Sequence, residues 1–339
     1  MNILVTGGCG FIGSNFINQR ISRYKDNVIN IDNLTYAGCK TNVNYRDEGD
    51  PKGYIQPYAP GVAAGVYKFY EGDITDSEFV KGVLVDNYIE CIVHFAAESH
   101  VDRSIKDPEV FIDTNIKGTF TLLEAYHAHC SKNTRFVHIS TDEVYGDLSE
   151  YQPAFTEESN IQPNSPYAAS KAASDLLCRS YHQTYNLPVL ITRCSNNYGP
   201  NQYPEKLIPL MIKNALAGKK LGVYGDGRNI RDWIHVDDHC EAIGAVLARG
   251  EPGEVYNIGG NHEVRNIDIV KMILKHLDLS TEMIEYIEDR KGHDWRYAMD
   301  TTKISTELDW SPLIPFATGL ESVIDQYWSP TPIGELNLQ

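Results

Sequence analysis

The sequence predicts an α/β fold, a doubly wound parallel sheet followed by a smaller C-terminal α/β region. Three observations predict it: short apolar runs that end in Gly or Asp, helical patterns between these runs, and a glycine-rich turn directly after the first run. Strands that alternate with helices form right-handed βαβ units and therefore a parallel sheet. A chain of 339 residues is long enough for one large domain or two fused ones.

The expected elements follow each other regularly in the first part of the chain. Residues 2–6 form an apolar run that suits a buried parallel strand, and the helical pattern of residues 11–22 comes next. Later strands are expected at residues 28–32, 91–97, 135–140 and 188–192, with helices at about 113–130 and 167–185.

Prolines break the remaining sequence into shorter elements, which indicates a second region. We therefore predict a dinucleotide-binding domain over residues 1–190 and a ligand-binding region over residues 191–339, with elements that can interleave. Residues 49–66 are rich in Gly and Pro, and we expect a surface loop without a chemical role.

Composition narrows the class of protein. The net charge of −16 and the pI near 5.1 argue against nucleic acid as a partner, because such surfaces need a basic stripe. The seven cysteines form no CxxC pair, which predicts reduced thiols, a cytoplasmic location and no metal site. We expect no membrane span, because no apolar run approaches about 20 residues, and no signal peptide.

The glycine-rich turn predicts a Rossmann-type dinucleotide site. Gly7, Gly10 and Gly13 lie between the first strand and the first helix, where glycines let a pyrophosphate approach the helix N-terminus. Asp32 ends the second strand, and a carboxylate there accepts hydrogen bonds from a ribose diol and favours NAD over NADP. The alternative is a tight turn that binds nothing.

Tyr167 and Lys171 are the candidate redox pair. Their spacing of four places both side chains on one face of the helix. A nearby ammonium favours the phenolate, so we expect Lys171 to lower the pKa of Tyr167 towards that of a useful base. Tyr36 and Lys40 have the same spacing, but Gly38 disfavours a helix there, and we interpret that pair as a coincidence.

Asp142 and Glu143 follow another strand, at the sheet edge where α/β proteins bind ligands. They can be ordinary solvated loop charges. If both are enclosed, their pKa values should separate, so that one carboxyl serves as an acid and the other as a base. Such a pair suits elimination of water, in which one group removes a carbon-bound proton and the other protonates the leaving hydroxyl.

Motifs along nearly the whole chain resemble the extended short-chain dehydrogenase/reductases and, within them, the dTDP-glucose 4,6-dehydratases. The resemblance rests on the glycine turn and on residues 32–38, 94–104, 140–146, 167–171, 193–200, 203–207, 231–233 and 289–294. Residues 141–143, Thr-Asp-Glu, are its most specific part. Cys9 and Gly222 depart from the family pattern, which usually has Ala and Pro there.

The resemblance implies a three-step reaction. Tyr167, supported by Lys171, removes the proton of the sugar C4 hydroxyl while hydride passes from C4 to NAD. Glu143 then removes the C5 proton as Asp142 protonates the C6 hydroxyl, and water leaves. Hydride returns to C6, so that NAD stays bound and is regenerated in each turnover. Thr141 resembles the hydroxyl that hydrogen-bonds O4.

The resemblance also implies two sets of binding residues and a homodimer packed through the helices near residues 113–130 and 167–185. The NAD set is Gly7, Gly10, Phe11, Ile12, Gly13, Asp32, Asn33, Leu34, Thr35, Asp73, Ile74, Ala96, Ala97, Ser99, Thr114, Tyr167, Lys171 and Asn197. The nucleotide-sugar set is Ser99, Thr141, Asn196, Lys206, Leu207, Val223, Tyr224, Arg231, Asn266, Arg290 and His293.

Three alternatives remain open. A UDP-sugar 4,6-dehydratase would use the same chemistry with another base pocket. A UDP-sugar epimerase or decarboxylase needs no acidic pair. A non-catalytic NAD-sensing protein would be expected to lack Tyr167, Lys171 or Glu143, and the chain contains all three.

Overall fold

The computed structural model describes residues 1–45, 65–290 and 292–328 of the 339-residue chain. Of the expected loop at 49–66, only Gly65 and Val66 lie within the described residues.

Seven parallel strands form the central sheet, in the order β10-β6-β5-β4-β1-β2-β3. This arrangement confirms the predicted doubly wound parallel sheet. The strands are β1 (Asn2–Thr6), β2 (Asn27–Asp32), β3 (Tyr67–Glu71), β4 (Cys91–His94), β5 (Arg135–Thr141), β6 (Val189–Cys194) and β10 (Val255–Ile258).

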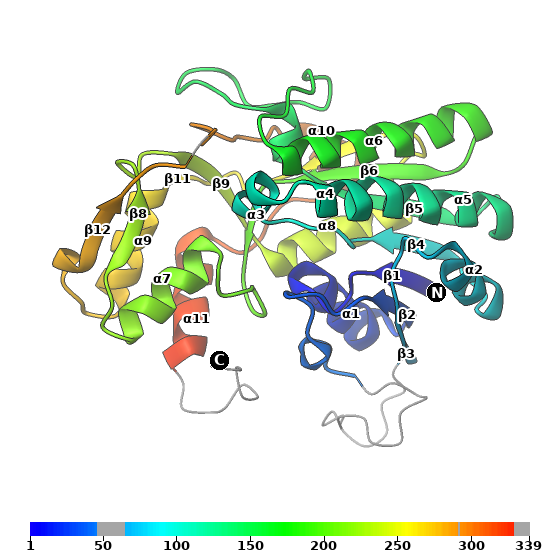
Figure 1. The fold of residues 1–339 in the computed structure, drawn as a ribbon, viewed down its shortest axis with the longest axis horizontal. Coiled ribbons are helices and arrows are strands. Elements are labelled where there is room, and N and C mark those ends of the chain that lie inside the picture. The colour runs from blue at the N-terminus through cyan, green and yellow to red at the C-terminus, as the bar shows by residue number, and fades with distance from the viewer. Residues whose placement is uncertain (46–64, 291, 329–339) are drawn as a thin grey trace.

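Helices cover both faces of this sheet, because successive side chains of each strand point to opposite faces. Ile3 and Val5 of β1 pack in one core with α1 (Phe11–Tyr24) and α8 (Val236–Arg249). Leu4 packs in the other core with α2 (Ser77–Asp86), α5 (Thr119–His129) and α6 (Pro166–Tyr185). Figure 1 shows α5 and α6 side by side along one side of the sheet.

A third core, which includes Trp233, Val270 and Leu320, holds the smaller C-terminal part together. Its helices are α7 (Leu207–Leu216), α9 (Asn266–His276) and α11 (Phe316–Trp328). Its strands form two small sheets, β11-β9-β7 (Glu263–Arg265, Ile230–His235, Asn196–Tyr198) and β12-β8 (Ile284–Ile287, Leu221–Tyr224). Figure 1 shows β8, β12, α7 and α9 grouped away from the large sheet.

The two parts of the chain interleave. After the small sheets begin, the chain returns to the large sheet, where β10 pairs with β6 and α8 packs against β5 and β6. The helix α10 (Thr302–Leu308) also packs against β10. Because elements from the later part of the chain complete the large sheet, residue 190 is not a sharp boundary in the fold. The division of function at that residue stays a prediction.

The expected helix at 113–130 begins differently from its sequence pattern. The short α3 (Val101–Lys106) and α4 (Glu109–Phe111) precede a π-helical segment, η2 (Ile112–Gly118), before α5 starts. Within η2 the Asn115 side chain accepts from the Glu98 N–H at 2.8 Å and donates to the Glu98 carbonyl at 3.0 Å. This pairing holds the loop after β4 against η2. The strand expected at 91–97 ends at His94, where its pairing with β1 also ends.

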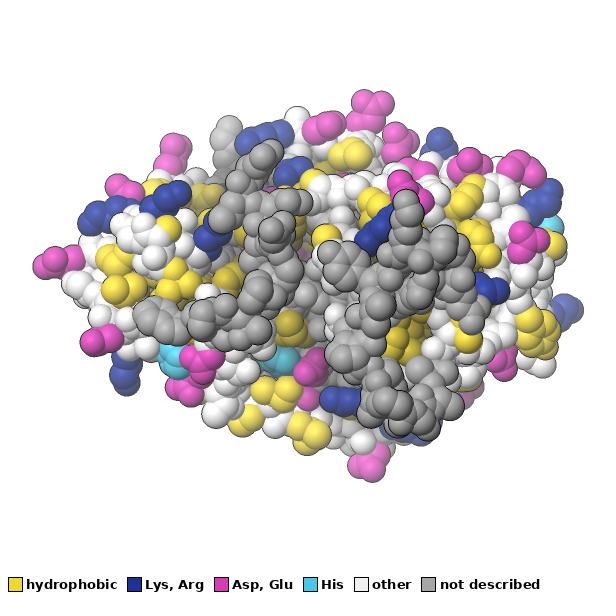
Figure 2. All heavy atoms as spheres, turned by 90° about the horizontal axis from the view of Figure 1, so that it is seen from below, with side chains coloured by type: hydrophobic (Ala, Val, Ile, Leu, Met, Phe, Trp, Pro, Cys, Tyr) yellow, Lys and Arg dark blue, Asp and Glu magenta, His cyan; other side chains and the backbone are white. Residues whose placement is uncertain are grey.

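The surface agrees with an acidic protein. On the face seen in Figure 2, Asp and Glu side chains are scattered, and outside the grey atoms the Lys and Arg side chains form no continuous band. None of the helices in the described part of the chain is long and apolar enough to cross a membrane.

Candidate active site

One cavity at the carboxyl ends of the central strands brings the two predicted sites together. Its walls include the Gly-rich turn, the loop after β4, the end of β5 and the start of α6. Of the predicted residues it is lined by Gly7, Gly10, Phe11, Ile12, Gly13, Asp32, Asn33, Thr35, Asp73, Ile74, Ala96, Ala97, Ser99, Thr114, Thr141, Asp142, Glu143, Tyr167, Lys171, Asn196, Asn197 and Lys206.

The turn after β1 needs its glycines for close packing. Gly7 has a φ of +71°, and a Cβ on it would lie 2.7 Å from Ala96 Cα. A Cβ on Gly13 would lie 2.4 Å from the Gly7 carbonyl oxygen. Helix α1 begins after Gly10, and among the described residues no side chain caps its N-terminus and no acidic residue lies in its first turn. Its first N–H groups can therefore receive an anionic group.

Asp32 is fixed beside this turn. Its carboxylate accepts from the backbone N–H groups of Cys9 and Leu34, each at 2.8 Å. Leu34 is outside the cavity wall and acts through its backbone, at a φ of +50°. The carboxylate thus stands at the end of β2 with lone pairs left for a ligand hydroxyl.

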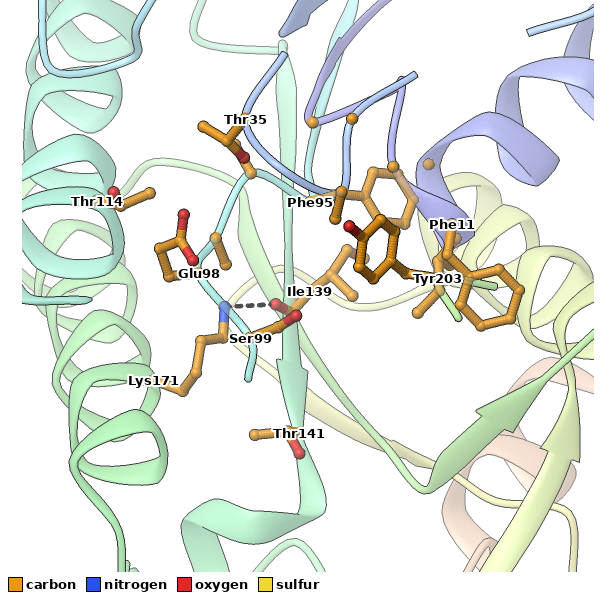
Figure 3. Close-up of a pocket in the computed structure, with 18 of the residues that line it drawn as sticks. Phe11, Thr35, Phe95, Glu98, Ser99, Thr114, Ile139, Thr141, Lys171 and Tyr203 are labelled. Carbon is orange, nitrogen blue, oxygen red and sulfur yellow. Dashed lines mark hydrogen bonds between the residues drawn. The ribbon is translucent and has the colours of Figure 1, made fainter. Parts of the chain in front are cut away.

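Tyr167 and Lys171 lie in the first turns of α6, where Ser165 caps the helix and Pro166 starts it. Lys171 is 3% exposed and donates a hydrogen bond of 2.7 Å to the Ile139 carbonyl. Figure 3 shows the Lys171 side chain reaching towards the strand at Ile139.

The expectation of a lowered pKa for Tyr167 is wrong, because its pKa is raised. Burial raises the pKa of the Tyr167 phenol well above its ordinary value, and Glu143 adds to the rise, while the hydrogen bond with Thr141 opposes it. The amino group of Lys171 is engaged with the Ile139 carbonyl. Desolvation of the phenolate is therefore the largest influence on the pKa of Tyr167.

Asp142 is buried and Glu143 is half-buried in the wall of the cavity, which argues against the interpretation as solvated loop charges. They begin the 3₁₀ turn η3 (Asp142–Tyr145), and Thr141 donates to Asp142 Oδ1 at 3.1 Å and accepts from the Glu143 N–H at 3.3 Å. Asp142 is 3% exposed, and burial followed by the charge of Glu143 raises its pKa well above the ordinary value. The environment of Asp142 therefore favours the protonated form of its carboxyl group.

Glu143 differs from its neighbour because cations face it. Burial raises the pKa of Glu143, but Lys206, Arg231 and Arg290 lower it. The two carboxyl groups thus experience unequal environments, as expected for an acid and a base side by side.

The predicted nucleotide-sugar residues separate into two groups. Ser99, Thr141, Asn196 and Lys206 line the cavity, whereas Leu207, Val223, Tyr224, Arg231, Asn266, Arg290 and His293 lie outside its wall. Three of the outer residues form a cluster, in which the Arg290 guanidinium lies 5.0 Å from the Tyr224 ring centroid and the His293 ring 6.2 Å from it. The positive charge of Arg231 lowers the pKa of His293 and that of Glu143.

Arg290 also connects the two parts of the chain through an ion pair of 3.0 Å with Asp102 of α3. Arg231 donates to the carbonyl groups of Asp294 and Trp295 at 2.8 and 3.3 Å. Val223 is 3% exposed and packs in the C-terminal core, so its side chain is not part of an open site.

Several cavity residues were missed by sequence reasoning, among them Glu98, Tyr203 and Glu205. Tyr36, whose spacing from Lys40 we interpret as a coincidence, also lines the cavity, with the Arg103 guanidinium 3.6 Å from its ring centroid and Tyr203 edge-on at 5.4 Å. Its position in the loop after Asp32 was the signal that could have found it, because that loop follows the carboxyl end of a central strand.

Comparisons with known proteins point to one kind of enzyme. The model of a family described as GDP-mannose 4,6 dehydratase matches residues 4–323. The dTDP-glucose 4,6-dehydratase of Xanthomonas campestris pv. campestris is 48% identical, with 96% of this chain and 92% of that protein covered. The corresponding protein of Escherichia coli is 46% identical, with 96% and 93% covered.

Solved structures agree with the sequence comparisons. The crystal structure of DesIV, a dTDP-glucose 4,6-dehydratase from Streptomyces venezuelae with NAD and dTDP bound, has a TM-score of 0.87 and 46% identity and covers 97% of both chains. A UDP-glucose 4-epimerase from Thermotoga maritima has a TM-score of 0.85 at 28% identity, with 97% and 99% covered. The fold alone therefore does not separate dehydration from epimerisation, and the side chains must.

Proposed function

The chain belongs to the dTDP-glucose 4,6-dehydratases of the short-chain dehydrogenase/reductase family, and we propose that it converts dTDP-glucose into dTDP-4-keto-6-deoxy-glucose. The observation that carries the proposal is the enclosure of Asp142 and Glu143 in the same cavity as Tyr167 and Lys171. Tyrosine and lysine serve any redox reaction at a sugar hydroxyl. Elimination of water needs an acid and a base in addition, which epimerisation does not.

NAD is the cofactor that the cavity fits. The glycine contacts leave the turn after β1 without side-chain bulk, and the uncapped N-terminus of α1 offers N–H groups to a pyrophosphate. Asp32 at the end of β2 suits a ribose diol. Bound NAD supplies a hydride acceptor that returns the hydride within the same turnover, so that it acts as a prosthetic group.

Tyr167 is the proposed base for the sugar C4 hydroxyl, and Thr141 the hydroxyl that holds O4. Thr141 lies in hydrogen-bond contact with both Tyr167 and Asp142, so it connects the oxidation site to the acid/base pair. Because burial and Glu143 raise the pKa of Tyr167, we propose that the phenol serves as a base with the help of Thr141, whose hydrogen bond lowers that pKa.

Glu143 and Asp142 divide the elimination between them. Oxidation at C4 acidifies the C5 proton, which Glu143 removes, while the protonated Asp142 gives its proton to the departing C6 hydroxyl. Lys206 and Arg231 keep Glu143 closer to its ionised form than Asp142. Arg231 and Arg290 are the proposed ligands of the nucleotide diphosphate, since guanidinium groups bind phosphate oxygens in pairs.

The chain is also proposed to act as a cytoplasmic homodimer, with residues 1–190 for NAD and residues 191–339 for the nucleotide sugar. All seven cysteines are free, which supports a reducing compartment. Ile112, Phe120 and Leu176 are 50%, 46% and 55% exposed along η2, α5 and α6, and this apolar face supports a helix-to-helix interface. Phe120→Glu should then yield monomers by light scattering; an unchanged mass would refute this interface.

The test offers the purified protein dTDP-glucose and UDP-glucose in separate reactions, with products identified by mass spectrometry and NMR. Loss of water from dTDP-glucose, with a ketone at C4 and a methyl group at C6, is the expected result. Loss of water only from UDP-glucose would replace the nucleotide assignment, and loss from neither would refute the dehydratase.

A further inference from the structure

Next to Lys171 lies a buried group of charged and polar side chains that the proposed mechanism does not use. Asp175 is one helical turn after Lys171 on α6 and is 1% exposed. Arg193 of β6, 4% exposed, donates to Asp175 Oδ2 at 2.9 Å. No hydrogen bond from a described residue reaches Asp175 Oδ1.

His138 of β5 stands between Asp175 and Lys171. Its Nε2 atom lies 3.5 Å from Asp175 Oδ1, 3.4 Å from Lys171 Nζ and 3.2 Å from Ser174 Oγ. Burial and the charge of Lys171 lower the pKa of His138 well below its ordinary value, so the ring is neutral. Because the ring carries no charge, it does not weaken the electrostatic attraction between the Asp175 carboxylate and the Lys171 ammonium.

Among the described residues, the histidine, cysteine and tyrosine side chains around Lys171 are neutral near pH 7. His94 of β4 has its pKa lowered to about 3 by burial. Burial raises the pKa of Cys194 on β6 to about 12 and that of Cys178 on α6 well above its ordinary value. Tyr167 is likewise protonated, as described above. Asp175 is therefore the carboxylate available to compensate the buried ammonium.

We propose that Asp175 is a positioning residue that keeps Lys171 positively charged at its place beneath the cavity, with Arg193 holding the carboxylate and His138 lying between the two. The physical need is clear, because an ammonium that is 3% exposed has lost nearly all of its hydration. Burial lowers the pKa of Lys171, and Asp175 is the largest influence that opposes this change. Arg193 orients the carboxylate so that Oδ1 is left for the His138 and Lys171 side.

The direct test measures the protonation of Lys171 without substrate. Only the uncharged amine reacts with acetic anhydride, and Lys171 lines the cavity, so the pH midpoint of its acetylation, read by mass spectrometry, reports its pKa. Asp175→Asn should lower this midpoint by about one to three pH units, the usual effect of losing an opposite charge nearby. Lys206, in the same cavity wall, is the internal reference and should keep its midpoint.

Asp26→Asn is the matched control. Asp26 is 4% exposed and forms a buried ion pair with Arg20, whose Nε donates at 2.7 Å, as Arg193 does to Asp175. This variant should lose comparable stability yet leave the midpoint of Lys171 in place. General loosening of the fold would raise labelling at every pH and would not move the midpoint.

Two further variants keep the proposal open to refutation. Asp175→Asn combined with Arg193→Gln removes both charges and leaves two amides that can form a hydrogen bond with each other. If the single variant does not fold, this double variant should show the lowered pH midpoint of Lys171 acetylation. Asp175→Glu retains the charge and should restore the midpoint to near the wild-type value. An unchanged midpoint in a folded variant without the carboxylate would overturn the proposal.

The kinetic consequence rests on the proposed function, whereas the labelling result does not. In single-turnover oxidation of dTDP-glucose, the alkaline fall in rate should begin at lower pH in Asp175→Asn than in the wild type. If the wild type did not oxidise dTDP-glucose, the proposed function would fail, and the acetylation midpoint would still decide the role of Asp175.

Discussion

Glu143→Gln separates oxidation of the sugar from loss of water. The change removes one negative charge from the cavity and keeps the shape of the side chain. Tyr167 and Lys171 remain in place on α6, and the Thr141 contact with the Glu143 backbone does not depend on the side chain. The variant should therefore oxidise C4 and then stop before dehydration.

The size of the effect follows from the surroundings of Glu143. Its carboxylate faces Lys206, Arg231 and Arg290, whereas the pKa of its neighbour Asp142 is raised well above the ordinary value by burial, so Asp142 is a poor replacement as the base for C5. Loss of a positioned general base typically lowers a rate by about 10²–10⁴-fold, or roughly 3–5 kcal/mol of barrier. The negative charge of Glu143 raises the pKa of Tyr167, and the substitution removes that charge. Tyr167 should therefore be no weaker as a base in the variant, and the oxidation step should not become slower.

The assay follows NADH by its near-ultraviolet absorbance and the sugar by mass spectrometry in a single turnover. NADH and a 4-ketohexose should accumulate in Glu143→Gln, and in D2O the C5 position should take up little deuterium. Glu205→Gln provides a comparison, because Glu205 lines the same cavity but is paired with Arg103 at 3.3 Å. A normal rate of dehydration in Glu143→Gln would refute the assignment of the C5 base.

Three other predictions follow from the same site. Gly13→Ala should lower stability by about 1–3 kcal/mol and release NAD, because its Cβ would meet the Gly7 carbonyl oxygen at 2.4 Å; chemical denaturation should show no such loss for Gly82→Ala, where nothing lies within 4 Å of the added Cβ. Asp142 has a raised pKa and acts as an acid, so dehydration should fall as pH rises through that pKa, and pre-steady-state rates of Asp142→Asn should lack this dependence. Asp32→Asn should weaken NAD binding, measured by calorimetry, and reduce the ratio of the affinity for NAD to that for NADP. Unaltered affinities for both dinucleotides would show that the carboxylate is not a ribose ligand.

Much of the fold could be predicted because the signals are local. The strand expected at residues 2–6 is β1, and the helix expected at 167–185 is α6 with one residue added at its start. A buried parallel strand is recognisable as a short apolar run, and Ser165-Pro166 is a recognisable helix start. The π-helical η2 could not be predicted, because the Asn115 contacts with Glu98 that accompany it join residues distant in sequence.

The candidate site was predictable to the extent that its members follow strands. Asp32, Asp142 and Glu143 end or follow β2 and β5, and parallel strands bring their carboxyl ends to one edge. Arg231 and Arg290 were named only through the family resemblance, and the structure shows why. Their relation to Glu143 depends on small sheets and a loop that bring them near from distant positions.

The comparison of Tyr36 with Tyr167 shows what spacing leaves undecided. Both tyrosines line the cavity, and both have a lysine four residues later. Lys40, however, forms an exposed ion pair with Glu71 at 2.9 Å, whereas Lys171 is buried against His138 and the Ile139 carbonyl. The chemistry of the pair therefore depends on how the lysine is enclosed. We propose that the acidic pair after β5 then determines the reaction, because Asp142 is buried and its pKa is raised beside Glu143.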